Sequence, residues 1–445
     1  MRCPSVRHAL VIPLLLLFSA PLAGQSGGID PRIVELTQAV SEDSLRALVD
    51  RLAGFETRHT LSSTDDPARG IGAARQWILD RMSSYSPRLQ VGFDTYVTPA
   101  RGRITREAEI RNVVAVLPGR SPRRVYISGH YDTVARREEG DRTPEGSNDN
   151  YAPGANDDGS GTALTMELAR VFSQSDLEFD ATLVFMTIAA EEMGLVGARL
   201  HAQQMAADSV GIDAVLNNDI TGNSKGGNGV VDGSTVRVFS EGPEDSPSRQ
   251  IARYVQRQAA RYMPGHKVRL IAREDRFGRG GDHTAFNQLG YAGVRITESR
   301  ENYDRQHTTR DTPDGVDAAY LARNARVNAA AAAGLALAPP APINTNERGA
   351  PALSRDPSGY DAHLQWQPSP GATGYRIFWR EAWGPDWQHE LFVGNVTEHT
   401  FEGLSIDDHI FGVAAVGQDG NESLVAAYVR PPRASTPVGV VRRGN

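Results

Sequence analysis

The sequence has almost no cysteine. Its single cysteine is Cys3, at the very start of a chain of 445 residues. The residues that follow can therefore form no disulfide, no zinc–thiolate site and no cysteine nucleophile. Without cross-links, the protein must be stabilised by the burial of apolar side chains. The chain is long enough for this, because it has room for two or three domains of ordinary size.

A large excess of charge of either sign is also missing. The chain has 47 lysines and arginines against 54 aspartates and glutamates, which gives a mild net charge of −7. No long basic run occurs, so the composition disfavours a nucleic-acid-binding surface. Long apolar runs are missing as well. Beyond residue 25, the sequence has no stretch of about 18 apolar residues, the length that a membrane-spanning helix requires.

The N-terminus has the pattern of a secretory signal peptide. Arg2 and Arg7 precede an apolar stretch over residues 9–18, and small residues follow as far as Gly24. This order predicts a signal peptide over residues 1–24, cut near Gly24 or Gln25. The mature protein is then expected to be soluble and either secreted or periplasmic. The alternative is that the segment remains as an uncleaved anchor.

Helical and strand-like patterns alternate from residue 29 to residue 338. Apolar residues at helical spacing predict helices over residues 29–54, 73–82, 161–172, 195–207, 251–262 and 318–338. Short β-rich runs predict strands over residues 113–117, 125–128, 182–189, 215–217 and 292–297. Strands that alternate with helices indicate an α/β domain over residues 29–338, with a mostly parallel central sheet flanked by helices.

The pattern changes at Pro339. Three prolines between residues 339 and 342 end the last predicted helix, and a polar linker covers residues 339–355. Residues 356–433 alternate between apolar and polar, which predicts a small β-sandwich, and residues 434–445 form a tail. The sandwich resembles a fibronectin type III module, although His409 stands where that family usually has tyrosine. We interpret it as a spacer rather than as a carbohydrate- or protein-adhesion module.

Acids and histidines gather in five short segments, most of them at the ends of predicted strands. These are residues 128–133, 153–161, 191–192, 217–219 and 306–312. Because the carboxyl ends of parallel strands meet at one edge of a sheet, where α/β proteins place their sites, we expect these segments to lie close together. Each segment alone is weak evidence. Five of them in chain order predict one site.

In three of these segments, the residue types and their spacing indicate specific chemical roles. His130 and Asp132 are two residues apart in an extended chain, so their side chains point the same way, and Asp132 is placed to hold the second ring nitrogen of a metal-binding histidine. The neighbours Glu191 and Glu192 can divide the work, one binding a metal and the other remaining a free base. Asp158 precedes a predicted helix and has the alternative role of a helix N-cap.

The five segments also resemble the ligand segments of a known family. SerGlyHisTyrAspThr (128–133), GlyAlaAsnAspAspGlySerGly (154–161), AlaAlaGluGluMetGly (189–194), AsnAsnAspIleThr (217–221) and HisThrThrArgAspThr (307–312) are similar to those of the M28 peptidases. The segment 280–284 looks like the family's pattern between its last two ligands. The resemblance spans roughly residues 41–338.

The resemblance implies a pair of zinc ions. It assigns His130 and Asp219 to one ion, Glu192 and His307 to the other, and Asp157 to a bridge between them. It also implies a cis peptide bond between Asp157 and Asp158. Two histidines and three carboxylates suit zinc, but they also suit cobalt or manganese, so the ligand types alone leave the metal open.

The resemblance further implies that Asp132 orients His130 and that Glu191 is the general base. The expected function is that of an aminopeptidase acting on peptide substrates. Three alternatives stay open: a carboxypeptidase whose Arg276, Arg279 and Arg295 bind the terminal carboxylate, a glutaminyl-cyclase-like acyltransferase with one zinc, and an inactive binding protein. If the three arginines do not bind a substrate carboxylate, they are surface charges or pair with Glu274 and Asp275.

Overall fold

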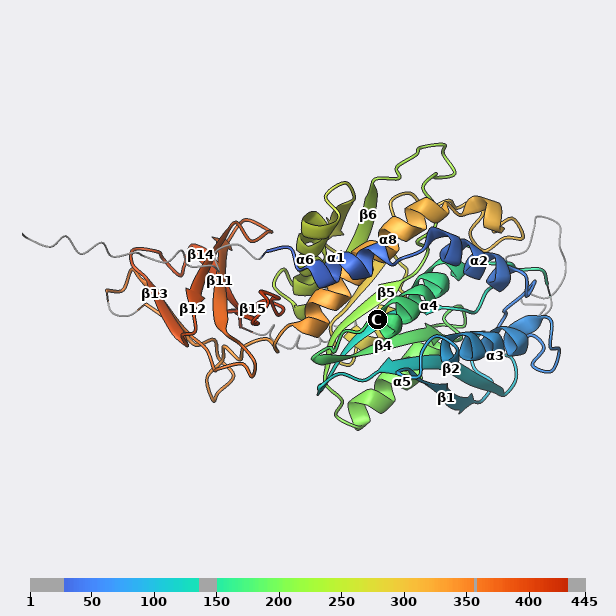
Figure 1. The fold of residues 1–445 in the computed structure, drawn as a ribbon, viewed down its shortest axis with the longest axis horizontal. Helices are drawn as coiled ribbons and strands as arrows, with labels where there is room; N and C mark the ends of the chain where they lie inside the picture. Colours follow the sequence, from blue (N-terminus) through green and yellow to red (C-terminus); the bar gives the residue numbers. More distant parts are fainter. Residues whose placement is uncertain (1–27, 136–149, 356–357, 431–445) are drawn as a thin grey trace, which may run out of the picture.

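The computed structural model describes residues 28–135, 150–355 and 358–430, which form an α/β domain and a smaller C-terminal β-module (Figure 1). The predicted signal peptide and the tail over residues 434–445 lie outside the described residues. Within the described part of the chain, no helix combines the length and the apolar character needed to cross a membrane.

Most helices in the described part of the α/β domain fall close to their predicted places, but the short helix over residues 282–287 was not predicted. The helices are α1 (Pro31–Gln38), α2 (Glu42–Ala53), α3 (Gly70–Ser83), α4 (Gly159–Gln174), α5 (Val196–Ala207), α6 (Pro247–Tyr262), α7 (Asp282–Asn287) and α8 (Ala318–Leu337), with a 3₁₀ turn, η1 (Pro313–Gly315). The segment predicted as one helix over 29–54 is two helices. The chain breaks because the Ser41 side chain accepts a hydrogen bond from the Ser44 N–H and caps a new helix.

Eight strands in the described part of this domain form one mixed sheet. They are β1 (Gln90–Thr98), β2 (Ala108–Leu117), β3 (Ser121–His130), β4 (Ala181–Ile188), β5 (Ile212–Asn218), β6 (Thr235–Ser240), β7 (Lys267–Ile271) and β8 (Gly293–Glu298). Their order is β1-β2-β4-β3-β5-β8-β6-β7. The central strands β4, β3, β5 and β8 are parallel, whereas β1, β2 and β6 run antiparallel to a neighbour. The parallel centre was predicted, and the flanking strands β1, β6 and β7 were not.

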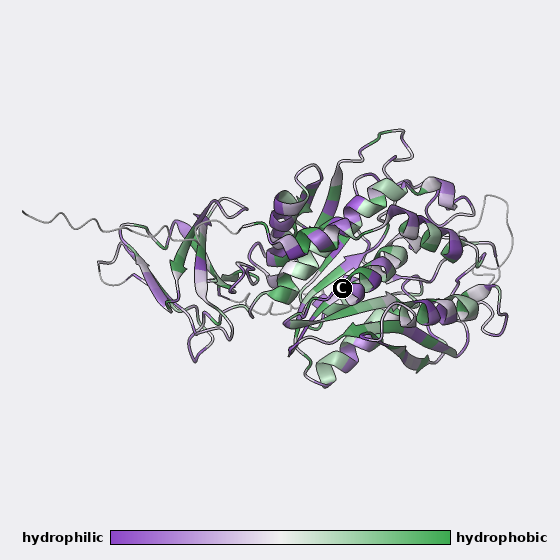
Figure 2. Ribbon diagram, in the orientation of Figure 1, coloured by the Kyte–Doolittle hydropathy of each residue, from purple (hydrophilic) through white to green (hydrophobic). Residues whose placement is uncertain are grey.

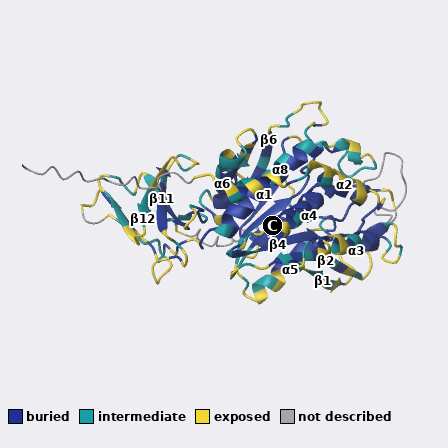
Figure 3. Ribbon diagram, in the orientation of Figure 1, coloured by how far each residue is buried: buried dark blue, intermediate teal, exposed yellow. Residues whose placement is uncertain are grey.

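Helices cover both faces of the sheet. In the larger core, α3, α4, α6 and α8 pack against one face, which is the near face in Figure 1, while α1 packs on α8 and α2 packs on α4 and α8. A smaller core around Tyr126 and Phe286 packs α5 and α7 against the other. As expected for a sheet that is covered on both faces, the central strands are both apolar and buried (Figures 2 and 3). The parallel strands can therefore end at a dry, rigid edge.

The β-module has two antiparallel sheets, of β9 (Leu353–Ser354), β10 (Ala362–Gln365) and β13 (Glu398–Phe401), and of β11 (Gly374–Glu381), β12 (His389–Gly394), β14 (His409–Val416) and β15 (Ala426–Ala427). Trp366, Tyr375 and Phe411 pack in the core between them. The His409 ring, which replaces the expected tyrosine, lies with Nδ1 3.0 Å from the Ser405 carbonyl oxygen. The fibronectin type III assignment stays a prediction.

The module is docked on the α/β domain through buried polar contacts. Glu422, 1% exposed, accepts hydrogen bonds from Arg376 of the module at 2.7 Å and from Arg257 of α6 at 2.7 Å. Asn421 donates to Asp30 at 2.8 Å, and Trp387 donates to Gln250 at 3.1 Å. A segment that acts only as a spacer needs no such interface.

Candidate metal centre

The carboxyl ends of β3, β4 and β5 carry three of the five predicted segments. These strands are neighbours in the sheet, in the order β4-β3-β5, so His130, Glu192 and Asp219 emerge side by side. The turns are tight. Ala190 before the glutamates, Ile220 after Asp219, and His307 itself all have a positive φ near 60°. Left-handed backbone is costly for such residues and gathers at functional sites.

The loop before α4 brings in the adjacent acids Asp157 and Asp158, and the second of them has the N-cap role that was one interpretation of this segment. Asp158 is the N-cap of α4 and accepts a hydrogen bond from the Gly161 N–H at 2.8 Å. It also accepts from the His130 N–H at 3.0 Å and the Ile220 N–H at 3.1 Å, so it ties three site segments together. The Asp157–Asp158 peptide bond is cis, as the resemblance implied.

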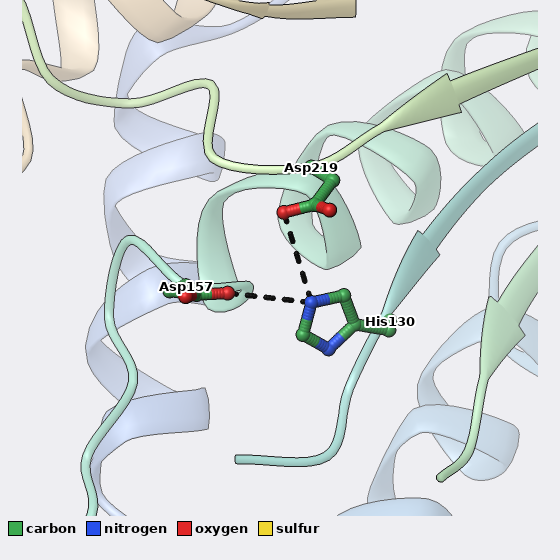
Figure 4. A group of neighbouring side chains, drawn as sticks. All are labelled: His130, Asp157 and Asp219. Carbon is green, nitrogen blue, oxygen red and sulfur yellow. Dashed lines mark ion pairs between the residues drawn. The ribbon is translucent and has the colours of Figure 1, made fainter. Parts of the chain in front are cut away.

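Asp157 lies between the two histidines. Its Oδ1 is 3.3 Å from Nε2 of His130, and its Oδ2 is 2.9 Å from Nε2 of His307. His130 Nε2 is also 3.8 Å from Oδ1 of Asp219, and Figure 4 shows both carboxylates facing this ring nitrogen. His307 Nε2 is 2.8 Å from Oε1 of Glu192. The five predicted ligands thus form two groups that share Asp157.

Asp132 contacts the His130 ring, although not in the way that the sequence predicted. The His130 ring lies with Nδ1 3.1 Å from the main-chain oxygen of Asp132, while the Asp132 carboxylate is farther away, at 3.6 Å. A carbonyl oxygen only accepts, so Nδ1 carries a hydrogen, and Nε2 can present its lone pair to a metal ion when the ring is neutral. The Asp132 carboxylate instead accepts the N–H groups of Glu191 and Glu192, at 3.0 and 3.2 Å.

The electrostatics of the centre are unbalanced. Burial raises the pKa of Glu191 and of Asp158 well above the usual value for a carboxyl group, and neighbouring acids raise it further. Burial opposes a charge on His307, but the carboxylates of Asp157 and Glu192 outweigh it and raise the His307 pKa to about 10. Buried acids in such excess over cationic groups favour the binding of a cation.

The donor atoms fit metal ions. Each group of three offers one imidazole nitrogen and two carboxylate oxygens within 4.8 Å of one another: His130, Asp157 and Asp219 in one, and Asp157, Glu192 and His307 in the other. Oε1 of Glu192 is buried, and its polar neighbour is Nε2 of His307, at 2.8 Å. A nitrogen and oxygen donor set without thiolate suits zinc. A third group, of His130, Glu191 and Glu192, overlaps these two.

Two of the three arginines considered for carboxylate binding are already paired. Arg295 is fully buried and lies 3.1 Å from both Asp219 and Asp275. Arg276 lies 3.1 Å from Asp275 and 2.9 Å from Glu301. The predicted pairing with Asp275 is therefore confirmed. Arg279 is exposed and makes one long hydrogen bond, of 3.4 Å, to Gln306.

Sequence reasoning missed several residues of the site. Arg58 lies under the loops of His130 and Asp157, and its guanidinium donates only to main-chain oxygens. Asp282 is fully buried, and neither of its carboxylate oxygens has a hydrogen-bond partner in the described part of the chain. Burial raises its pKa well above the usual value. An arginine or aspartate without a neighbouring ligand gives no local signal. Only the Gly280–Thr284 resemblance pointed toward Asp282.

The other four histidines of the described part of this domain belong to none of these groups. His59, His201, His266 and His283 are all buried. His201, for example, lies between Asp94 and the Tyr126 hydroxyl, 2.9 and 3.1 Å away.

Comparisons with known proteins decide the family. Residues 112–332 match the model of peptidase family M28. A protein of Pyricularia oryzae described as a probable zinc metalloprotease is 40% identical over 420 residues, which cover 85% of this chain and 80% of the relative. The chain belongs to peptidase family M28. It is a zinc metalloprotease of that family, and its substrates are peptides.

Solved structures support the fold of this M28 protein. The LapA aminopeptidase of Legionella pneumophila superposes with a TM-score of 0.55 at 21% identity, over 70% of this chain and 76% of LapA. A glutaminyl cyclase of Porphyromonas gingivalis superposes with a TM-score of 0.52 at 19% identity, over 66% of this chain and 97% of the cyclase. Identities this low show a shared fold and leave the reaction to be argued from the site.

Proposed function

We propose that this M28 metalloprotease is an exported aminopeptidase with two zinc ions, in which Glu191 is the general base. One observation carries the proposal: the two oxygens of Asp157 face different histidines, at 3.3 and 2.9 Å. A carboxylate placed in this way suits a bridge between two ions. His130 and Asp219 would hold one ion, and Glu192 and His307 would hold the other.

Zinc, when bound, supplies a Lewis acid that lowers the pKa of water and polarises the scissile carbonyl. The protein supplies the base and its orientation. Glu191 takes a proton from the attacking water and delivers it to the amine of the leaving group. Burial raises the pKa of Glu191 well above the usual value, which is the direction that makes a carboxylate a stronger base. Asp132 fixes the base by accepting the Glu191 N–H.

The charges around the centre favour an N-terminal over a C-terminal substrate end. A carboxypeptidase needs a free cation to bind the terminal carboxylate. Arg295 and Arg276 are instead engaged by Asp219, Asp275 and Glu301. An excess of carboxylates suits the ammonium group of a free N-terminus. The shared position of Asp157 likewise favours two ions over the single zinc of a cyclase-like enzyme.

The first test is hydrolysis of aminoacyl p-nitroanilides by the purified mature protein, with zinc measured on the same sample before and after chelation. We expect about two zinc ions per chain, cleavage of substrates with a free amine only, and loss of cleavage on chelation. Two zinc ions with cleavage of N-blocked peptides would support a carboxypeptidase instead. A protein that binds no metal would overturn the proposal.

The role of Glu191 is tested by Glu191→Gln, which keeps the size of the side chain and removes the base. We expect kcat to fall by about 10²- to 10⁴-fold while zinc content stays unchanged. Glu167→Gln is the matched control. Glu167 is a fully buried glutamate of α4 that pairs with Arg170, so its loss should affect stability and leave kcat near the wild-type value. Wild-type turnover by Glu191→Gln would exclude it as the base.

Export rests on residues 1–24 and is tested by the N-terminal sequence of the protein made in its own host. Recovery outside the cytoplasm with a start near Gln25 is the expected result. Recovery of intact Met1 with the cells would contradict it.

A further inference from the structure

Arg58 is a cation buried beneath the metal centre. It lies between α2 and α3, N-terminal to the residues that match the family, and it is fully buried. Burying an arginine is costly unless its donors are satisfied, so the fold must provide acceptors for the guanidinium at this position.

The guanidinium of Arg58 donates to four main-chain oxygens. Nε donates to Tyr131 at 2.6 Å, Nη1 donates to Leu52 at 2.8 Å and to Pro153 at 2.6 Å, and Nη2 donates to Gly154 at 2.8 Å. Three of these oxygens belong to the segments of the proposed ligands. Tyr131 stands between His130 and Asp132, and Pro153 and Gly154 begin the turn that leads to Asp157.

The backbone around Arg58 connects the same two segments. The Arg58 N–H donates to Oγ1 of Thr133 at 2.9 Å, and Oγ1 of Thr133 donates to the Ala152 oxygen at 2.9 Å. Two residues on, the Thr60 hydroxyl donates to Asp132 at 3.2 Å. The loops of His130 and Asp157 are therefore joined through Arg58.

The shape of the side chain explains why arginine is present here. The four oxygens come from three chain segments, and a planar guanidinium presents several N–H groups in fixed directions that can reach them together. A lysine ammonium is a point donor with three hydrogens and cannot reproduce this pattern. Gly154 also leaves no room for rearrangement. It has a φ of +48°, and a Cβ there would lie 2.2 Å from the Thr133 side chain.

We propose that Arg58 is a positioning residue for the zinc pair, which sets the distance between His130 and Asp157 by clamping the main chain of their loops. The inference rests on the proposed two-zinc centre. It concerns geometry rather than charge, and the two can be separated. A positive charge beside the centre repels metal ions, so a variant that only lost this charge should bind zinc more tightly.

The test compares Arg58→Lys, which keeps the charge, with Arg58→Met, which removes it. Zinc affinity is measured by competition with a chromophoric chelator, and the visible spectrum of the cobalt-substituted protein reports ligand geometry. If Arg58 is a clamp, both variants lose about 10- to 100-fold in affinity for at least one ion, the range for groups that orient metal ligands. Both cobalt spectra should also change.

Arg380→Lys and Arg380→Met are the matched controls. Arg380 is 2% exposed and also donates to main-chain oxygens, those of Glu381, Ala382 and Gly384, but it lies in the β-module. Its variants should lose stability and keep the wild-type zinc affinity and cobalt spectrum. This contrast separates a clamp on the centre from the general cost of replacing a buried arginine.

Each outcome decides something. Wild-type affinity and spectrum in Arg58→Lys, or tighter zinc binding in Arg58→Met, would overturn the inference in favour of a charge effect. So would Arg58→Lys protein that stays unfolded both with and without zinc, because Arg58 would then be a general requirement of the fold. If the wild-type protein itself bound no pair of zinc ions, the proposed function would fail before Arg58 came into question.

Discussion

Two regions of this protein bury charged side chains, and they do so in different ways. At the module interface, Glu422 lies within 2.7 Å of both Arg257 and Arg376, and Arg380 lies within 2.7 Å of Asp245. At the metal centre the described acids outnumber the cations: Asp132, Asp157, Asp158, Glu191, Glu192, Asp219 and Asp282 against His130, His307, Arg58 and Arg295. At the interface, arginines of the protein neutralise the buried carboxylates. At the centre, the described cationic groups are too few to do so.

The difference lies in what each region can do when folding is complete. An ion pair with satisfied partners holds two surfaces together and needs nothing further. In an acid cluster, carboxylate oxygens without a hydrogen-bond partner among the described residues, such as those of Asp282, are costly to bury, and a bound cation relieves that cost. The two regions are also well separated. β3 leads from Arg123, which binds the oxygen of Ala338 near the module, to His130, a distance of roughly 25 Å.

The largest expected effect comes from Asp157→Asn. This change keeps the volume of the shared carboxylate but removes its charge, so both proposed ions lose a ligand. We expect the protein to retain less than one zinc per chain after dialysis and to lose measurable peptidase activity. Zinc analysis and p-nitroanilide hydrolysis check this. Asp213→Asn, at the start of β5, is the control and should retain both.

If Asp157→Asn retained two tightly bound ions, the comparison would fail. Metal binding at the centre would then not depend on the shared carboxylate.

The second prediction concerns the pH dependence of zinc stabilisation. Without metal, the raised pKa values of Asp158 and Glu191 mean that the folded state holds protons that the unfolded state releases. The stability of the zinc-free protein should therefore fall as pH rises above the usual carboxyl range toward neutrality. The difference in Tm between zinc-loaded and chelated protein should widen from pH 5 to pH 7. A difference that narrowed over this range would contradict the charge argument.

The contribution of the interface to stability should change with pH in the opposite direction. Burial opposes the charge on Glu422, but Arg257 and Arg376 outweigh it and lower its pKa below the usual 4.5. Its stabilising effect is therefore full above that value and is lost as pH falls through the folded pKa. Glu422→Gln should destabilise the protein at pH 7, and the loss should shrink below pH 4. Urea unfolding of both proteins at each pH measures this.

Full removal of the same carboxylate gives a larger effect on stability. Glu422→Ala leaves two arginines without their main partner, and breaking a buried pair in this way costs about 3 kcal/mol or more. The exposed Glu402→Ala, on the same module, is the control. Equal stability of the two variants would mean that the interface is not held by its buried charges.

The sequence predicted what depends on local pattern. His130, Glu192 and Asp219 could be placed because each follows a strand, and the parallel strands β4, β3 and β5 end at one edge. Arg58 could not be placed, because its acceptors lie at Tyr131, Pro153 and Gly154, far away along the chain. Long-range contacts of this kind leave no periodicity in the sequence.

The same reason explains the other differences. The antiparallel strand β6 was missed because its partner, β8, comes more than fifty residues later. The interface was missed because Glu422 looks like an ordinary polar residue of a turn in the sequence. Its partner Arg257 is brought beside it only by folding. Trp387 likewise gives no sign that its partner is Gln250 of α6. Where function depends on a strand end the sequence was informative, and where it depends on a distant partner it was not.

The smallest expected effect tests whether burial, rather than ion pairing itself, gives the interface its strength. Arg32 also pairs across the interface, with Asp419 at 2.8 Å, but the Asp419 side chain is 58% exposed and Arg32 keeps a second partner in Asp30. Asp419→Asn should change the free energy of unfolding by less than about 1 kcal/mol, and added salt should remove the change. Urea unfolding at low and high salt measures it. A loss as large as that of Glu422→Ala would show that the rim of the interface, and not its buried centre, holds the module in place.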